Sequence, residues 1–197
     1  MRVLVIFCHP CADSFNAAIY RTALAALAES GHENRTHDLY AEGFQPVMTP
    51  EEWQTYMTTT EPLLTRTAKH AEDLRWCEAL IVIYPTWYYG APAMLKGWIE
   101  CVFLPGVTFA VSESSGKIAK LFLTNIRQFI GITTSGSPWW WIKLVGDPGR
   151  KLWTRGLFMR WITGTRSRWL QLYDMNHTTE DSRAAFLAKV DRALRKL

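Results

Sequence analysis

The chain has 197 residues, which suits one domain or one domain with an appendage. Hydrophobic residues make up 48% of it and charged residues 20%, so the composition is that of a globular protein and argues against a disordered chain. The net charge of +4 is compatible with anionic ligands such as nucleotides, but it is too small to predict a nucleic-acid-binding protein. No apolar run reaches the ~20 residues of a membrane-spanning helix.

The first part of the chain begins with a strand pattern. Arg2–Cys8 is almost continuously apolar, as in a strand buried on both faces, and we interpret it as this strand and not as a signal peptide. The expected location is therefore the cytoplasm. Ser14 is a candidate N-cap of a helix that ends at Gly31. Glu33–Leu39 alternates in polarity and predicts a second strand nearer a sheet edge, and Ala41–Thr60 predicts a long connection with short helical pieces.

The middle of the chain repeats this alternation. Pro62–Cys77 has apolar residues at helical spacing. Ala79–Tyr84 ("ALIVIY") is the clearest buried strand, and Ala93–Leu104 predicts the helix that follows it. Within Thr108–Asn125, "SESSGK" predicts a loop and "IAKLFL" a strand or the arm of an inserted hairpin.

The last part predicts two strands and two helices. The strands are Arg127–Thr133 and Trp169–Tyr173, and the helices are Lys151–Thr163 and Thr179–Lys196. Strands that alternate with helices form a parallel sheet covered on both faces. The sequence therefore predicts a single α/β domain over residues 1–197, a flavodoxin-like doubly wound five-stranded parallel sheet of order 2-1-3-4-5.

Ligands of such folds bind outside the carboxyl ends of the strands. Three loops are expected to meet there: "HPCADSFN" after the first strand, "PTWYYGAP" after the third and "TTSGSPWWW" after the fourth. The first starts a helix near Ser14, where backbone N–H groups favour a phosphate. The loop after the third strand, called the third loop, offers rings and backbone amides to a flat heteroaromatic ligand such as an isoalloxazine, although the rings could also be core or interface residues. The loop after the fourth strand, called the fourth loop, offers small hydrogen-bonding residues.

The four cysteines, Cys8, Cys11, Cys77 and Cys101, predict no metal site. Cys8 and Cys11 form a C-x-x-C pair, which is found in dithiol and zinc sites. A zinc site would require a second close pair, and Cys77 and Cys101 are 24 residues apart. Free thiols are the simpler interpretation.

These loops resemble the flavodoxin-like NAD(P)H:quinone oxidoreductase family, also called DT-diaphorase or NAD(P)H dehydrogenase (quinone). The most specific part is the run "YGAPAMLKGW" within "YPTWYYGAPAMLKGWIECVFLPG", and "HP…SFN" and "TTSGSPWWW…GDPG" support it. The resemblance covers Met1 to about Gly149 well and the rest loosely. It implies a bound flavin, FAD in most members with FMN as the alternative, and a homodimer with the active site at the interface. It also implies a ping-pong cycle, in which NAD(P)H reduces the flavin at N5 and a quinone-like acceptor then takes two electrons.

The resemblance also assigns residues to this site. The diphosphate side of the flavin would be held by His9, Ser14, Phe15, Asn16 and Ala17. The isoalloxazine would lie along Pro85, Thr86, Trp87 and Tyr88, with Gly90 allowing the sharp turn. The other side of the ring would be held by Thr133, Thr134, Ser135 and Gly136. The candidate catalytic residues are Tyr89 and Trp139.

The chain departs from the family at two positions. Trp139 and Val145 occupy the places where the best-studied members carry a Tyr and a His that handle charge on the reduced flavin. The pocket is therefore expected to be a weaker proton donor.

Two alternatives remain open from the sequence. The chain could be a flavin-bound regulatory subunit of a membrane transporter such as a potassium-efflux system, because relatives of this fold dock on such transporters. The stretch "GRKLWTRGLFMRWITGTRSRW" could lie on a membrane surface, although an amphipathic helix that covers the sheet is the preferred interpretation. Its Arg residues could also meet the phosphates of FAD or NADPH.

Overall fold

The sheet has the predicted order. The structure is a computed structural model, and it describes residues 1–111, 118–158 and 164–197. Five parallel strands lie in the order β2-β1-β3-β6-β7, which is 2-1-3-4-5 when these strands alone are numbered. They are β1 (Arg2–Phe7), β2 (Glu33–Asp38), β3 (Ala79–Pro85), β6 (Gln128–Thr134) and β7 (Arg166–Leu172). This confirms the flavodoxin-like fold class.

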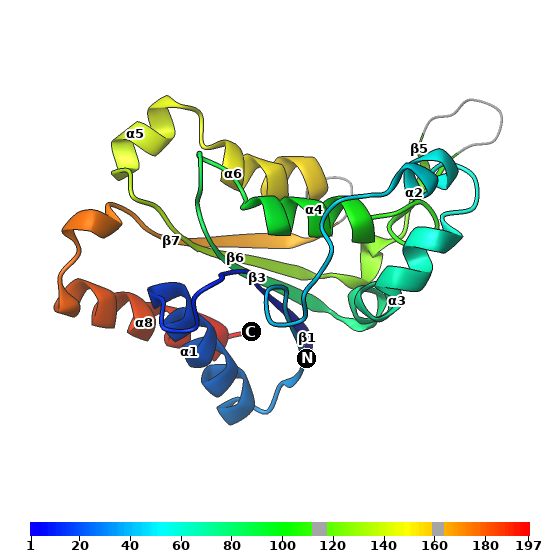
Figure 1. The fold of residues 1–197 in the computed structure, drawn as a ribbon. Helices are drawn as coiled ribbons and strands as arrows, with labels where there is room; N and C mark the ends of the chain where they lie inside the picture. Colours follow the sequence, from blue (N-terminus) through cyan, green and yellow to red (C-terminus); the bar gives the residue numbers. More distant parts are fainter. Residues whose placement is uncertain (112–117, 159–163) are drawn as a thin grey trace.

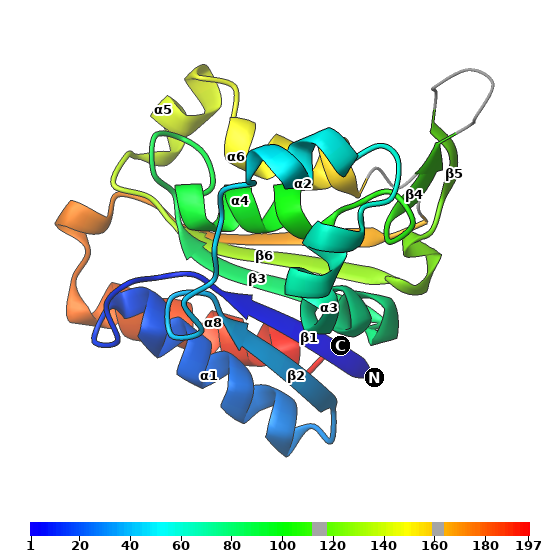
Figure 2. The same cartoon turned by 45° about the vertical axis from the view of Figure 1, so that its right-hand side comes forward.

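Helices cover both faces of the sheet (Figure 1). On one face, α1 (Phe15–Glu29) packs beside α8 (Glu180–Leu194). The other face is covered by α3 (Glu61–Trp76), α4 (Ala93–Val102) and the π-helical η2 (Leu152–Leu157). Figure 2 shows the two layers and both chain ends near the amino end of β1.

The strand pattern explains the two cores. Successive residues of a strand point to opposite faces, so Val3 and Val5 join the core under α1 and α8, whereas Leu4 and Ile6 join the core under α3 and α4. Because both faces are covered, β1 and β3 are buried almost throughout.

Local signals set the ends of α1. The Ser14 hydroxyl accepts a hydrogen bond from the backbone N–H of Ala17 at 3.1 Å, as expected of an N-cap. After α1, Gly31 has a φ of 70°, the left-handed conformation that ends many helices. Both predictions are confirmed.

The remaining connections are short elements. They are α2 (Pro50–Thr55), β4 (Phe109–Val111), β5 (Ile118–Leu121), η1 (Leu123–Asn125), α5 (Trp139–Leu144), α6 (Pro148–Lys151) and η3 (Met175–His177). β4 and β5 pair antiparallel, so the inserted hairpin arm is confirmed. The expected loop over 112–117 lies outside the described residues.

Three expectations need correction. β7 begins at Arg166 and not at Trp169, because its first residues are polar and exposed at a sheet edge. The helix expected over Lys151–Thr163 begins earlier, at Pro148, and its helical part ends at Leu157, with 159–163 outside the described residues. The three tryptophans that follow β6 lie on α5, where the sequence predicted a loop.

The preferred interpretation of the basic stretch holds for its described part. Trp153 of η2 is fully buried against the sheet, and its Nε1–H donates to the Tyr84 hydroxyl at 3.0 Å. Arg150, Lys151 and Arg155 lie on the exposed side. No helix in the described ranges has the length and apolarity needed to cross a membrane.

Candidate functional site

The three loops meet at the carboxyl end of the sheet, as predicted. The Asn16 side-chain amide donates to the Thr134 hydroxyl at 3.0 Å and so joins α1 to the end of β6. The Thr86 backbone N–H donates to the Thr134 carbonyl at 2.7 Å, and the hydroxyls of Thr86 and Thr133 hydrogen-bond to each other at 2.9 Å. These bonds fix the loops after β1, β3 and β6 side by side.

The start of α1 offers free donors. The cap uses the backbone N–H of Ala17, but within the described residues the N–H groups of Phe15 and Asn16 have no partner. The Asn16 Oδ1 atom is buried and also has no partner among the described residues. A buried polar atom without a partner is costly, so these groups suit a polar ligand at this helix start.

The side chains of this first loop have local partners. His9 Nδ1 accepts from the backbone N–H of Cys11 at 3.0 Å. The centroid of the His9 ring lies 6.3 Å from that of the Trp87 ring, so the His9 side chain lies next to the third loop. The Phe15 ring packs toward Phe186 of α8, which leaves the Phe15 backbone as the part that faces a ligand.

The third loop is a tight turn made by two tyrosines. Trp87 and Gly90 exchange backbone hydrogen bonds at 3.0 and 3.2 Å. Tyr88 and Tyr89 between them have φ values of 46° and 64°, the pattern of a type I′ turn that normally uses Asn and Gly. The expectation that Gly90 supplies the turn is therefore wrong, because its φ is not positive and the tyrosines adopt the left-handed conformation.

This turn stores strain and exposes rings. A left-handed non-glycine residue costs about 1–2 kcal/mol, and such strain concentrates at functional sites. The Tyr88 side chain is fully exposed at 101%, and Trp87 is 43% exposed. Pro85, at the end of β3, is buried.

The third and fourth loops enclose a cleft of about 230 Å³. Predicted residues line most of it: Thr86, Tyr88, Tyr89, Ser135 and Gly136. Two further lining residues, Ser137 and Ile142, were missed by sequence reasoning. Ile142 belongs to α5, and the missed helix explains the missed residue.

The candidate catalytic residues are not in contact with each other. The Tyr89 hydroxyl accepts from Nε1–H of Trp141 at 2.9 Å, whereas Trp139 is 59% exposed and does not line the cleft. Val145 ends α5 and is exposed. The role of Trp139 stays a prediction.

The cysteines are free thiols. Cys8 is buried, and this burial raises its pKa to about 12, whereas Cys11 is exposed in the first loop. A thiol with so high a pKa is a poor nucleophile.

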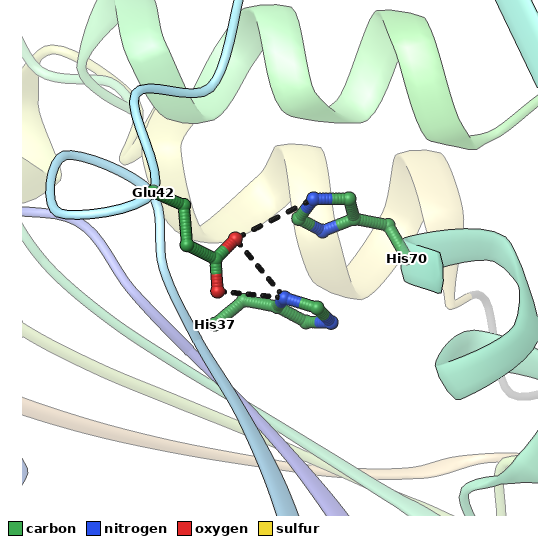
Figure 3. Close-up of side chains that lie close together, drawn as sticks. All are labelled: His37, Glu42 and His70. Carbon is green, nitrogen blue, oxygen red and sulfur yellow. Dashed lines mark hydrogen bonds and ion pairs between the residues drawn. The ribbon is translucent and has the colours of Figure 1, made fainter. Parts of the chain in front are cut away.

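A second polar cluster lies under α3, and sequence reasoning did not find it (Figure 3). His37 Nδ1 lies 3.0 Å from a Glu42 carboxylate oxygen, and His70 Nε2 lies 3.5 Å from the other one. The remaining ring nitrogen of His37 is 2.8 Å from Asp73. The ligand atoms of His37, Glu42 and His70 all lie within 4.8 Å of one another, close enough to hold a metal ion.

The hydrogen bonds of His70 oppose a metal ion at this cluster. Trp98 Nε1–H can only donate, and it lies 3.2 Å from His70 Nδ1, which must therefore accept. Burial, and secondarily the neighbouring His37, lower the pKa of His70 to about 3, so the ring is neutral near pH 7. Its hydrogen is then on Nε2, the atom that a metal would need.

The residues at the carboxyl end of the sheet fit a flavin. The free N–H groups of Phe15 and Asn16 suit its phosphate, and the unpaired Asn16 Oδ1 suits a hydroxyl of its ribityl chain. The exposed ring of Trp87 and the small residues Ser135 and Gly136 suit a flat ring system between the loops.

Comparison with known proteins identifies the family. The whole chain, residues 1–197, matches the family described as "Flavodoxin-like fold". It is 30% identical over 210 residues to NAD(P)H dehydrogenase (quinone) 1 of Cavia porcellus, a match that covers 95% of this chain and 74% of that protein. It is also 30% identical to a ribosyldihydronicotinamide dehydrogenase-like protein of Penicillium crustosum, with 69% of this chain and 58% of that protein covered. The chain thus spans little more than half of the latter relative.

Solved structures agree with the fold. A protein from Streptococcus mutans has a TM-score of 0.83 at 27% identity, with all of both chains covered. The NAD(P)H:quinone oxidoreductase of Methanothermobacter marburgensis has a TM-score of 0.80 at 24% identity, with 100% of this chain and 96% of that chain covered. The resemblance inferred from the loop residues is confirmed, and the chain belongs to the flavodoxin-like fold family, with NAD(P)H dehydrogenases (quinone) among its relatives.

Proposed function

We propose that the protein is a flavin-dependent NAD(P)H:quinone oxidoreductase that works by a ping-pong cycle. The proposal is supported chiefly by three features that lie together at one end of the sheet. They are the free backbone N–H groups at the start of α1, the Asn16 amide oxygen without a described partner, and exposed aromatic rings. The bound flavin would supply the acceptance and release of two electrons.

The residues of the chain would bind and orient the reactants. The start of α1 at Phe15 and Asn16 would hold the flavin phosphate, with His9, Ser14 and Ala17 shaping that loop. Pro85, Thr86, Trp87 and Tyr88 would support one side of the ring system. The other side would be held by Thr133, Thr134, Ser135 and Gly136.

The cleft beside Tyr89 would receive the nicotinamide and the quinone-like acceptor in turn. The Tyr89 hydroxyl accepts from Trp141, so its own hydrogen is free to be donated to an acceptor oxygen. Trp139 would cover the cleft from α5. Without the family's Tyr and His at Trp139 and Val145, we expect Tyr89 to be the main donor from this chain.

The cofactor is proposed to be FAD, on the resemblance of the loop residues. A structural neighbour from Bacillus anthracis is named an FMN-dependent NADH-azoreductase, but at 14% identity it shares the fold alone. FMN is therefore the alternative.

We also propose a homodimer in the cytoplasm with the active site at its interface. The exposed aromatic residues beside the cleft, among them Trp139 and Trp140, support a covering partner. The relatives reported above are named as oxidoreductases, and no described feature favours a subunit of a membrane transporter.

The test is steady-state oxidation of NAD(P)H by the purified, flavin-loaded protein with menadione as acceptor. We expect turnover that requires the flavin, with parallel lines in double-reciprocal plots when the acceptor concentration is varied. Flavin-loaded protein that oxidises neither NADH nor NADPH with menadione would overturn the proposal. Intersecting lines would be consistent with the proposed oxidoreductase activity but would exclude the ping-pong mechanism.

A further inference from the structure

A basic pocket borders α5, the helix that also borders the proposed flavin cleft. Its lining includes Lys143, Arg150, Lys151, Thr154 and Arg155, and it has a volume of about 280 Å³. Ile142 lines the flavin cleft and Lys143 lines this pocket, so neighbouring residues of α5 border the two cavities. We call it the basic pocket below.

The local folding of the chain gathers these cations. In the segment formed by α6 and η2, Trp153 is buried against the sheet. Arg150, Lys151 and Arg155 of this segment are exposed to solvent. Gly146, with a φ of 90°, joins α5 to α6. The Lys151 ammonium lies over this glycine, 3.5 Å from where a Cβ atom would be.

The basic pocket has more positively charged side chains than carboxylates to pair with them. Asp147 is its carboxylate, and Lys143 forms an ion pair with it. Within the ranges that the structure describes, Arg150, Lys151 and Arg155 have no acidic partner. The Thr154 hydroxyl donates to the Arg150 carbonyl at 3.0 Å, so the three unpaired cations are the donors left for a ligand.

Three cations without partners suit a doubly charged phosphate. Guanidinium groups bind phosphate oxygens through paired N–H donors, and an ammonium adds a point charge. The flavin phosphate is proposed to bind at the start of α1, where Phe15 and Asn16 lie. On that proposal the basic pocket is free for the phosphate of a second ligand.

The basic pocket is attached to the flavin cleft. The Gly149 N–H of α6 donates to the Tyr89 carbonyl at 2.9 Å, and a Cβ at Gly149 would lie only 2.9 Å from that oxygen. The tyrosine turn and the start of α6 are therefore in direct contact. A dinucleotide with its nicotinamide in the cleft could extend past this contact toward the basic pocket.

We propose that the basic pocket binds a phosphate monoester, and that this group is the 2′-phosphate of NADPH, which NADH lacks. The assignment rests on the proposed function and makes the enzyme selective for NADPH. A lipid headgroup has the same phosphate chemistry, and the experiment separates the two sources.

The test compares adenosine 2′,5′-bisphosphate with adenosine 5′-monophosphate by calorimetry on the flavin-loaded protein. We expect the bisphosphate to bind at least about 10-fold more tightly, because charged hydrogen bonds to the extra phosphate are worth more than one decade of affinity. The variant Lys151→Ala/Arg155→Ala should lose this preference and raise the KM for NADPH about 10-fold, with the KM for NADH unchanged.

The matched control is Lys189→Ala/Arg192→Ala, which removes one lysine and one arginine from the exposed side of α8. It should retain the preference. Equal affinities in the wild-type protein, or equal losses in both variants, would overturn the proposal. So would sedimentation with phosphatidylserine vesicles that depends on Lys151 and Arg155 without a preference for the bisphosphate.

The nucleotide binding experiment does not depend on turnover. If the protein oxidises neither dinucleotide, the proposed function fails while calorimetry still decides whether the basic pocket binds the 2′-phosphate. If it oxidises NADH and NADPH with equal kcat/KM, the function stands and the basic pocket assignment fails.

Discussion

Two groups of tryptophans distinguish the core from the candidate site. Trp98 and Trp153 are completely buried, and each indole N–H has a partner, His70 for the first and Tyr84 for the second. Trp139 and Trp140 are each 59% exposed on α5, and Trp87 of the third loop is 43% exposed. The same residue type thus has opposite surroundings within one chain.

Buried and exposed tryptophans contribute differently, the first to stability and the second to binding. A buried tryptophan contributes through packing, provided that its N–H is satisfied. A group of exposed rings adds little to stability, and such clusters mark surfaces that interact with a ligand or another chain. Substitutions in the two groups should therefore change different measurements.

The largest expected effect is on the stability of the core. Trp153 stacks on Phe129 at 5.2 Å between ring centroids, so Trp153→Ala removes a large ring from the core. We expect the free energy of unfolding to fall by about 3–5 kcal/mol, measured by urea denaturation. The control Trp140→Ala should change it by less than about 0.5 kcal/mol. Equal losses of stability in the two variants would show that the exposed ring stabilises the fold as much as the buried one, contrary to this expectation.

The next effect is on flavin affinity. Trp87→Ala removes an exposed ring from the proposed flavin site, so the Kd for flavin should rise about 10-fold to 100-fold while the Tm of the flavin-free protein is unchanged. Fluorescence titration with FAD measures the affinity. Trp53→Ala, at an exposed ring on α2, is the control and should leave the Kd unchanged. A Kd for Trp87→Ala equal to that of wild type would remove Trp87 from the site.

A smaller effect concerns the partner of Trp98. Burial lowers the pKa of His70 from 6.5 to about 3 in the folded protein. As pH falls below 6.5, the unfolded chain binds a proton at this residue and the folded protein does not, so stability decreases toward pH 3. The loss should be about 1 kcal/mol between pH 6 and pH 5. Urea denaturation of His70→Gln, whose amide oxygen can still accept from Trp98, should show a shallower decrease, and an unchanged pH dependence would exclude His70 as its source.

The smallest effect separates stability from binding at one residue. Tyr88 has a left-handed φ of 46°, where Asn is far more favourable in a type I′ turn. Tyr88→Asn should stabilise the flavin-free protein by about 0.5–1 kcal/mol and weaken flavin binding. A decrease in Tm would show that the tyrosine ring contributes to stability and that the turn is not strained.

Most of the fold follows from local patterns in the sequence. Continuous apolar runs such as Ala79–Tyr84 predict the central strands because both sheet faces are covered. The sequence predicts a start at Trp169 for β7, three residues after the true start at Arg166, because an edge strand can carry polar residues such as Arg166 and Arg168. α5 was missed because three successive tryptophans have no helical periodicity, and the helix is too short to require any.

The candidate site was predictable in its location and less so in its details. The loops after β1, β3 and β6 must meet because parallel strands end at one edge, and Asn16, Thr86 and Thr134 do meet there. The strained tyrosine turn was not predictable, since sequence statistics assign left-handed positions to glycine. The basic pocket is formed by residues of α5, α6 and η2, and its shape depends on how these elements pack, which local sequence patterns do not predict.

The loops after β1, β3 and β6 are proposed to hold a flavin. To test this, the purified protein is incubated with FAD and FMN together and then heated, and the small molecule that it releases is identified by mass. We predict a yellow protein that releases FAD in an amount equal to the chain. A colourless protein that takes up neither FAD nor FMN would contradict the claim.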